Sequence, residues 1–565
     1  MLKKLGIAQL LTPNLKWFEQ QQTSILSAAI IITGANVVSA LAALVRQRIL
    51  TNIFFDTPQL QQQLEAFLVS FQVPDMMFQL LVIGSVSAAF IPVFTAIKKS
   101  HDEKAAFSLM NSVLTALLLC FFVLGSVVAF FSQEITDWRT GAAYTPEQVV
   151  LTAHLTRWLL VAQLFFVISS VHAAFLQSYQ RFIVPALAPI LYNIGIIFGA
   201  IFFSPSLGIE GPALGVCIGA FLHMAIQIPF SRKLRYRYRP SFNFKTPGFS
   251  KIITLMPART ITLAVSEAQT LILTFFTTNL GNLSYLIIRY AMIIITLPIR
   301  FFGVPIGQAS LPFLSEQSEP SERSVFKELL TKSLNQVAFF AMPASILIII
   351  LRLPIVRIVF GTPNFPWEEA TLPLAKIVGI IAISITVQSM VQIVIRAFFA
   401  LKDTWTPLLV AAFDLSMFVG GLLLINTFMP EQGILGIAWI ICAAAFFELF
   451  WLLWLLHRRI GQLLTTSLLI NQLKIILASF LMAVFLYLPY RIFDDYVFNT
   501  SRALELVLLT ITTSTIGMVV YIYFAQLFRI PELALVLKLL GGVIKTRTIV
   551  PTTEVVAQQS ENETI

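Results

Sequence analysis

Several charged and amide side chains lie in stretches of the sequence that are otherwise apolar enough to cross a membrane. A charge at the centre of a bilayer costs roughly 2.5–3.5 kcal/mol on insertion scales, so one that persists there usually faces water or a partner. Arginine suits phosphate because its planar guanidinium donates two parallel hydrogen bonds to the oxygens. We therefore predict a polar cavity that binds an anionic substrate containing phosphate. The candidate binding residues are Arg46, Glu65, Asp75, Gln79, Arg259, Arg289 and Arg300.

Four of the polar positions in the second apolar segment have the spacing of one helix face. Glu65, Gln72 and Gln79 recur every seven residues, and Asp75 is one turn from the last two. Such positions line up along an α-helix, which predicts a single polar stripe. The alternative interpretation is internal neutralisation, in which Arg46 pairs with Glu65 or Asp75 and binds nothing else.

The later arginines have a helical spacing too. Arg289 and Arg300 are eleven residues apart, which is about three turns, so both should point to one side, about 16 Å apart along the axis. Arg259 lies in the preceding segment, where its alternative role is to pair with Glu267.

A second set of acids inside predicted spans could bind a proton or a monovalent cation that drives transport. The candidate coupling-ion residues are Glu267, Asp414 and Glu448. Pairing with Arg396 is the alternative for the last two. The five histidines are scattered, and the three cysteines lie in apolar runs, so we expect no metal site.

The motifs of several enzyme classes are missing from the sequence. It has no phosphate-binding loop and no nucleophile elbow at a strand–helix junction. We therefore expect neither ATP-driven transport nor enzyme catalysis. We expect no cofactor, and coupling to the membrane potential or to a monovalent cation. Asp403, shortly before Pro407, is interpreted as a helix cap rather than a substrate contact.

The composition identifies the elements that must position these side chains. The chain has 565 residues, of which 57% are hydrophobic and 12% charged, whereas soluble domains average about 25% charged. A span needs roughly 20 apolar residues, and such segments predict an all-α polytopic membrane protein with about 14 transmembrane helices.

The placement of lysine and arginine predicts the orientation. With the N-terminus in the cytoplasm, the predicted inner loops hold roughly three times as many of these residues as the outer loops. Both termini are therefore predicted to be cytoplasmic. The net charge of +10 needs no nucleic acid, because the basic run at 232–239 is expected to face anionic lipid.

The sequence resembles itself at an offset near 220 residues. The segments 84–92 and 175–185 correspond to 303–312 and 397–407. Parallel repeats of this kind form two lobes that expose a substrate alternately to each side of the membrane. The repeat predicts two six-helix lobes related by pseudo-twofold symmetry, with two further helices. The expected domains are an N-lobe of spans 1–6 (1–232), a C-lobe of spans 7–12 (233–460), spans 13–14 (461–545) and a disordered cytoplasmic tail (546–565).

Four blocks, 176–193, 298–315, 354–361 and 396–407, resemble the MurJ (MviN) lipid II flippases of the MOP transporter superfamily. The resemblance implies a flippase that moves the undecaprenyl-pyrophosphate-linked peptidoglycan precursor from the cytoplasmic to the periplasmic leaflet. It also implies a central cavity lined by spans 1, 2, 7 and 8, a groove for the lipid tail at spans 13–14, and a place in the bacterial inner membrane. The expected partners are lipid II or a related glycolipid, membrane lipids and cell-wall synthesis proteins.

The chain departs from the family pattern at several cavity positions. Span 1 keeps Arg46 but lacks the family's earlier arginine, and Phe78 and Gln79 replace an arginine pair in span 2. Ile293 stands at the usual arginine position of span 8, one turn from Arg289. These departures leave three alternatives open: an exporter of another polyprenyl-linked oligosaccharide, a MATE-like cation antiporter, or a transport-inactive scaffold of envelope assembly.

Overall fold

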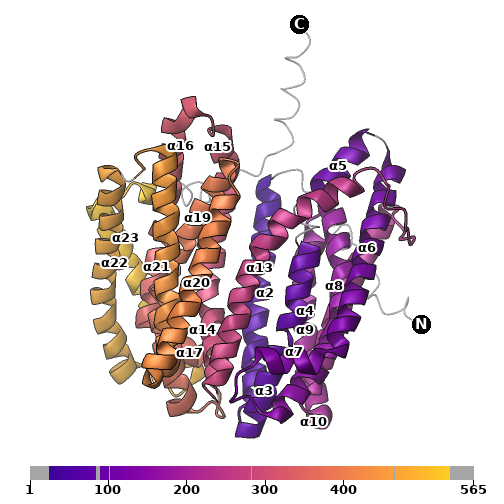
Figure 1. Cartoon of the computed structure of the whole chain (residues 1–565). Coiled ribbons are helices and arrows are strands. Elements are labelled where there is room, and N and C mark those ends of the chain that lie inside the picture. Colours follow the sequence, from indigo (N-terminus) through magenta and orange to yellow (C-terminus); the bar gives the residue numbers. More distant parts are fainter. Residues whose placement is uncertain (1–24, 84–89, 101, 282, 464, 535–565) are drawn as a thin grey trace, which may run out of the picture. The chain divides into compact units, whose positions relative to one another are not determined.

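The structure is a computed structural model that describes residues 25–83, 90–100, 102–281, 283–463 and 465–534 (Figure 1). Within these residues the chain forms helices and short connections, and no β-strand occurs. The predicted all-α class is confirmed. The tail predicted at 546–565 and most of the repeat segment 84–92 lie outside the described residues.

Most of the helices are long enough to cross a membrane. In the described residues, 12 helices have the necessary length and apolar character, and a thirteenth candidate is the pair Trp367–Ala382 and Ile385–Ala400, bent by 43°. Helix α13 (Phe249–Asn279) occupies the position predicted for a further span and has 31 residues, but it contains many polar side chains. The protein is thus a multi-pass membrane protein, and the predicted fourteen spans are compatible with this structure.

Contacts between the helices divide the chain into two units. Unit 1 contains the residues up to Ala291, together with Val356–Ile377 and Ala411–Ile440. Unit 2 contains Met292–Ile355, Val378–Val410 and the residues from Ile441 onward. The domain boundaries at 232, 460 and 545 stay predictions.

Unit 1 holds most of the predicted binding residues. Its helices are α2 (Ile25–Phe54), α3 (Pro58–Ser70), α4 (Gln72–Phe78), η2 (Gln79–Ile83), α5 (Ile91–Ser100), α6 (Glu103–Phe130), α7 (Ser132–Arg139), α8 (Pro146–Ser178), α9 (Ile183–Phe198), η4 (Gly199–Phe203), α10 (Ser204–Leu207), α11 (Glu210–Ala225), α12 (Gln227–Lys233), α13, η7 (Trp367–Thr371) and η8 (Pro430–Gln432).

Unit 2 contains fewer helices. They are η5 (Ile299–Gly303), α15 (Val304–Glu316), η6 (Pro320–Glu322), α16 (Arg323–Ile350), α19 (Ile385–Ala400), α22 (Thr466–Ile492), η9 (Phe493–Val497) and α23 (Ala503–Leu527). Five helices run from one unit into the other: α14 (Ser284–Pro298), α17 (Arg352–Phe360), α18 (Leu372–Ala382), α20 (Trp405–Phe428) and α21 (Gly433–Ile460).

Helix α8 is at the centre of packing in unit 1, where it contacts α3, α6, α7 and α11 (Figure 1). Its Phe175 packs with Phe94, Phe121 and Tyr236 in one buried cluster. Each of these aromatic side chains is almost completely buried, so the cluster holds α5, α6 and the segment after α12 against α8. This packing fixes the frame to which the polar helices α3, α4 and α7 attach.

Helices α9 and α11 approach each other through glycines. A Cβ atom added to Gly199 would lie 2.5 Å from the Gly211 carbonyl oxygen and 2.6 Å from the Gly215 Cα. One added to Gly195 would lie 2.4 Å from the Gly219 Cα. Because the neighbouring atoms belong to the backbone, they cannot move aside as a flexible side chain would. The two helices therefore need glycine at these positions.

Replacing one of these glycines should destabilise the protein. We expect Gly199→Val to lower the free energy of unfolding by about 1–3 kcal/mol, the usual cost of overpacking, as a lower melting temperature of the purified protein. Gly420→Ala in α20 is the matched control, since an added Cβ there meets no atom within 4 Å. Equal melting temperatures for the two variants would contradict the close approach of α9 and α11.

In unit 2, helix α16 contacts α15, α19 and α22, and α22 pairs with α23 (Figure 1). The core includes Phe326, Ala341, Phe398 and Leu452, which are all fully buried. Its helices are therefore held together by apolar side chains that leave few polar groups to satisfy.

Asp403 caps helix α20, as predicted. Its Oδ1 accepts hydrogen bonds from the backbone nitrogens of Trp405 at 3.1 Å and Thr406 at 3.0 Å, and its Oδ2 accepts one from the Thr406 hydroxyl at 2.7 Å. The carboxylate also forms an ion pair with Arg459 at the end of α21. Burial raises the pKa of Asp403, but the hydrogen bonds and Arg459 outweigh it, and the pKa is lowered from its ordinary value of 3.8.

This cap predicts a dependence of stability on pH. A carboxyl whose pKa is lower in the folded state stabilises the fold above its ordinary pKa, and loses that contribution as the pH falls through the folded value. We expect the melting temperature of the wild type to fall as the pH drops below about 4, and that of Asp403→Asn to fall less. Glu431→Gln, at an exposed acid, is the control. Parallel curves for wild type and Asp403→Asn would contradict the prediction.

Candidate functional site

Four of the predicted binding or ion-site residues come together in unit 1 from four different helices. They are Arg46 in α2, Asp75 in α4, Glu267 in α13 and Arg289 in α14. Arg46 lies close enough to interact electrostatically with Asp75 and with Arg289. Arg289 interacts in the same way with Asp75 and Glu267. Residues more than 200 positions apart in the sequence thus form one charged cluster.

The charges of this cluster interact at a distance and do not form close ion pairs. Among the described residues, no nitrogen–oxygen contact within 4 Å joins either arginine to either acid. Asp75 accepts a hydrogen bond of 2.6 Å from the Gln163 amide. Arg289 is exposed, and Arg46 and Glu267 are half-buried. The guanidinium of Arg289 can therefore still be reached by an anion.

Buried aromatic packing determines where Arg289 points. The adjacent Tyr290 is fully buried, with its ring stacked on Phe360 at a centroid distance of 4.3 Å and its hydroxyl 3.1 Å from Thr51 Oγ1. Successive side chains on an α-helix are about 100° apart around the axis. Burying Tyr290 against α2 and Phe360 therefore turns Arg289 toward another side of the helix, where it is exposed.

The predicted polar stripe does not run along one continuous α-helix. Glu65 is in α3, which ends at Ser70, Asp75 is in α4, and Gln79 begins the π-helical turn η2. Pro74 contributes to the irregularity because it has no N–H to donate. The structure therefore separates the stripe into three short elements.

Glu65 has a partner outside the charged cluster. It is 3% exposed and accepts a hydrogen bond from the Gln148 amide at 3.4 Å. The described residues contain no ion pair between Glu65 and Arg46. Gln79 is half-buried, and Arg300 is exposed in unit 2. Arg259 is in α13, but its side chain lies outside the described part.

Arg139 is a polar contact that sequence reasoning missed, because its neighbours in the sequence are typical of an outer loop. It ends helix α7 and is 4% exposed. Its guanidinium donates to Gln72 Oε1 at 2.6 Å and to the Val69 carbonyl at 3.1 Å. The Gln72 amide in turn donates to the hydroxyls of Thr274 and Tyr285. Arg139 and Gln72 therefore join α7 to α3, α4, α13 and α14, three of which carry residues of the charged cluster.

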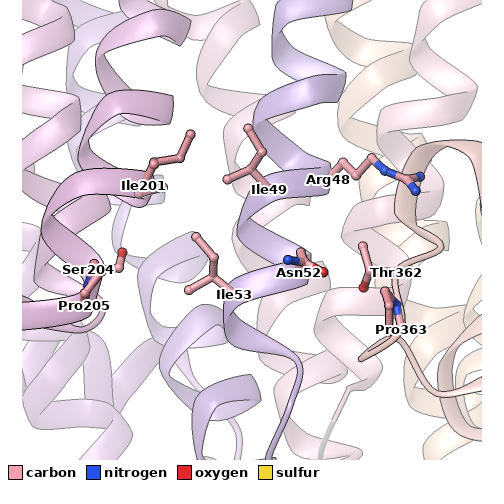
Figure 2. Close-up of a pocket in the computed structure, with 10 residues that line it drawn as sticks. Arg48, Ile49, Asn52, Ile53, Ile201, Ser204, Pro205, Thr362 and Pro363 are labelled. Carbon is pink, nitrogen blue, oxygen red and sulfur yellow. The ribbon is translucent and has the colours of Figure 1, made fainter.

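A separate cavity of about 570 Å³ lies beside α2 (Figure 2). Ile49, Ile53 and Ile201 form much of its wall, and Arg48 is at its edge. The Arg48 guanidinium donates to the carbonyls of Arg357 at 3.3 Å and Ile358 at 2.5 Å. Arg48 therefore satisfies the last turn of α17, where a cation is also favoured by the helix dipole, and does not extend to the membrane surface as an isolated charge.

The candidate coupling-ion residues are distributed over both units. Asp414 in unit 1 is 7% exposed, and its Oδ1 has no hydrogen-bond partner in the described part of the chain. Glu448 is half-buried in unit 2. No group of three or more His, Cys, Asp or Glu side chains among the described residues could hold a metal ion.

Comparison with known proteins gives a consistent result. The family model described as lipid II flippase MurJ matches residues 50–521. A probable lipid II flippase MurJ from Thermotoga maritima is 29% identical over 391 residues, which is 67% of this chain and 76% of the relative. A second, from Bdellovibrio bacteriovorus, is 25% identical over 503 residues and covers 87% and 93% of the two chains.

Two solved structures show the same fold. A lipid II flippase MurJ in an inward closed conformation matches with a TM-score of 0.70 and 23% identity, over 88% of this chain and 98% of that one. An inward-facing multidrug resistance MATE transporter of the MOP superfamily matches with a TM-score of 0.59 and 15% identity, over 78% and 99%. Because the family model covers most of the sequence, the chain belongs to the lipid II flippase MurJ family, which is a family of membrane transporters and not of enzymes.

Proposed function

We propose that this protein is a flippase that moves lipid II from the cytoplasmic to the periplasmic leaflet by alternating access. The observation that carries the proposal is the charged cluster of Arg46, Asp75, Glu267 and Arg289, in a chain of the MurJ family. A lipid-linked pyrophosphate is the anion that such a pair of guanidinium groups would bind.

The balance of charge in the cluster suits a transporter that must also release its cargo. Two arginines and two carboxylates give the site almost no net charge when all four are ionised. The pyrophosphate oxygens accept hydrogen bonds from Arg46 and Arg289, while Asp75 and Glu267 limit how tightly the anion is held. The sugar head group lies among polar side chains, and the polyprenyl tail stays in the lipid.

The driving force belongs to the proposal as well. We propose coupling to the membrane potential or to a monovalent cation, with Glu267, Asp414 and Glu448 as the candidate carboxylates. The buried Asp414 supports this role, because its Oδ1 has no hydrogen-bond partner among the described residues. A buried polar atom without a partner is costly, and a bound proton or cation would relieve that cost.

We further propose an orientation and a setting in the cell. The protein lies in the bacterial inner membrane with both termini in the cytoplasm, as the distribution of lysine and arginine favours. Its partners are lipid II, membrane lipids and proteins of cell-wall synthesis.

Growth rescue tests the proposed cargo. Cells depleted of their own lipid II flippase are supplied with this protein, and its amount in the membrane is measured. We expect growth and normal cell shape to return. Failure to rescue at a normal membrane level would overturn lipid II as the cargo. Accumulation of another polyprenyl-linked oligosaccharide, efflux of a fluorescent cation, or no transport at all would then distinguish the three alternatives.

A further inference from the structure

A basic segment follows helix α12 and runs along helix α6 without regular secondary structure. Residues 235–239 read Arg-Tyr-Arg-Tyr-Arg. The Tyr236 hydroxyl donates to Asn111 Oδ1 at 2.8 Å, and the Tyr238 hydroxyl is 2.9 Å from Thr115 Oγ1. Because successive side chains of an extended chain point to opposite sides, the two tyrosines that face α6 leave the three arginines on the outer side, where they are exposed.

Polar side chains of α6 fix this segment in place. Thr115 Oγ1 accepts a hydrogen bond from the Ser241 backbone nitrogen at 3.0 Å. The Ser112 hydroxyl is bonded to the Asn243 carbonyl at 3.0 Å and is 3.0 Å from Thr246 Oγ1. The arginines are therefore carried on an ordered strip of chain, which reduces the entropy lost when they bind a ligand.

The segment closes one end of a cavity of about 670 Å³ in unit 1. Its apolar wall comes from α6, α8, α11 and α12, and its polar end comes from α8, α12 and the basic segment. The apolar lining residues are Leu114, Leu118, Ile168, Met224 and Ile228, and the polar ones are His172, Arg232, Tyr236, Arg237 and Tyr238. A space that is apolar along one side and cationic at one end matches the shape of a lipid with an anionic head group.

A buried histidine at the polar end gives independent support for a ligand. His172 is 5% exposed, and its Nδ1 is 2.9 Å from the buried Ser231 hydroxyl. Its Nε2 makes no hydrogen bond within the described residues, although the ring lines the cavity. Arg232 lies close enough to interact electrostatically with this ring. The cavity thus offers a hydrogen-bonding nitrogen beside a cation, both of which a phosphodiester can use.

The charge at this site has little to neutralise it. The sequence contains no Asp or Glu between Glu210 and Glu267. The ion pairs of the described residues do not include Arg232 or Arg237. A phosphate group would therefore enter an uncompensated positive potential.

We propose that this cavity binds one acidic phospholipid, with its phosphodiester at Arg232, Arg237 and His172 and an acyl chain along the apolar wall. The site is separate from the charged cluster of Arg46 and Arg289 and does not depend on what the protein transports. It gives the transporter a specific lipid ligand, beyond a general attraction to an anionic membrane surface.

The test measures lipid retention by the full-length protein in nanodiscs of phosphatidylcholine that contain a minor fraction of phosphatidylglycerol. Released from the discs, the wild type should keep one phosphatidylglycerol about tenfold more often than its share of the lipid predicts. Arg232→Gln combined with Arg237→Gln should remove this preference. Lys98→Gln combined with Lys99→Gln, which removes the same charge outside the cavity, should keep it.

A cavity-filling variant and a competition with phosphate separate a bound phospholipid from misfolding and from an adventitious anion. Ile228→Trp fills the apolar part of the cavity and leaves the arginines intact, so it should also lose the preference. Unchanged helical content and melting temperature would exclude misfolding as the cause. The proposal is overturned if both double variants lose the preference equally, if Ile228→Trp keeps it while correctly folded, or if inorganic phosphate displaces the lipid as well as free phosphatidylglycerol does.

Discussion

Arg289→Ala and Arg46→Ala should each abolish the growth rescue of cells depleted of their lipid II flippase. Both guanidinium groups belong to the charged cluster, and neither is locked to a carboxylate within 4 Å among the described residues. A charge-assisted hydrogen bond contributes about 1.5–3 kcal/mol, so losing one should weaken substrate binding roughly 10- to 100-fold. The measurement is colony formation at matched protein levels in the membrane.

Conservative variants make the prediction specific to phosphate binding. Arg289→Lys keeps the charge but loses the paired hydrogen bonds, so it should rescue growth partly. Arg157→Ala, at an exposed arginine of α8 that donates to Ala129 and Ser132, should rescue fully. Full rescue by both Arg46→Ala and Arg289→Ala would show that the cluster does not hold the substrate.

The second large effect is expected at Arg139. Arg139→Ala removes two hydrogen bonds from a buried cation and leaves Gln72 Oε1 and the Val69 carbonyl without this donor. We expect the free energy of unfolding to fall by about 3 kcal/mol and the amount of folded protein in the membrane to fall with it. The measurement is chemical unfolding of the purified protein.

The matched comparison for this variant is again Arg157→Ala, because Arg157 also ends in hydrogen bonds but is exposed. Its loss should cost less than about 1 kcal/mol. Arg139→Lys should fall between the two, since one ammonium group cannot reproduce the fork that reaches Gln72 and Val69. An Arg139→Ala protein as stable as Arg157→Ala would refute the role of Arg139 in joining the polar helices.

The sequence alone was sufficient for the fold class, because hydropathy depends only on composition along the chain. Segments such as 105–133 and 506–528 carry almost no charge, and the structure places them in the long helices α6 and α23. The cap at Asp403 was also predictable, since it depends on residues three positions apart. In both cases the relevant physics is local.

The site could be predicted only in part, because it depends on contacts between distant helices. The types of Arg46, Asp75 and Arg289 identify them as candidates, but their proximity depends on how α2, α4 and α14 pack. The spacing of the polar stripe predicts one α-helix, whereas the chain breaks at Phe71 and forms a π-turn at Gln79. Seven-residue spacing cannot reveal such a break.

Arg139 shows what the sequence concealed. The segment 132–139 is polar and short, as an outer loop would be, and only the fold places its last residue beside Gln72. One signal was available: Gln72 is an amide in an apolar segment, and a buried amide needs a donor and an acceptor. That signal predicts a partner without saying which residue supplies it.

The most direct test of the central claim is the affinity of the purified protein for lipid II. The dissociation constant is measured for the wild type and for the double variant Arg46→Ala/Arg289→Ala, with a neutral polyprenol as the reference ligand. If the cluster holds the pyrophosphate, the double variant should bind lipid II at least roughly 100-fold more weakly while its affinity for the polyprenol is unchanged. Equal affinity of both proteins for lipid II would contradict the assignment of the pyrophosphate to this cluster.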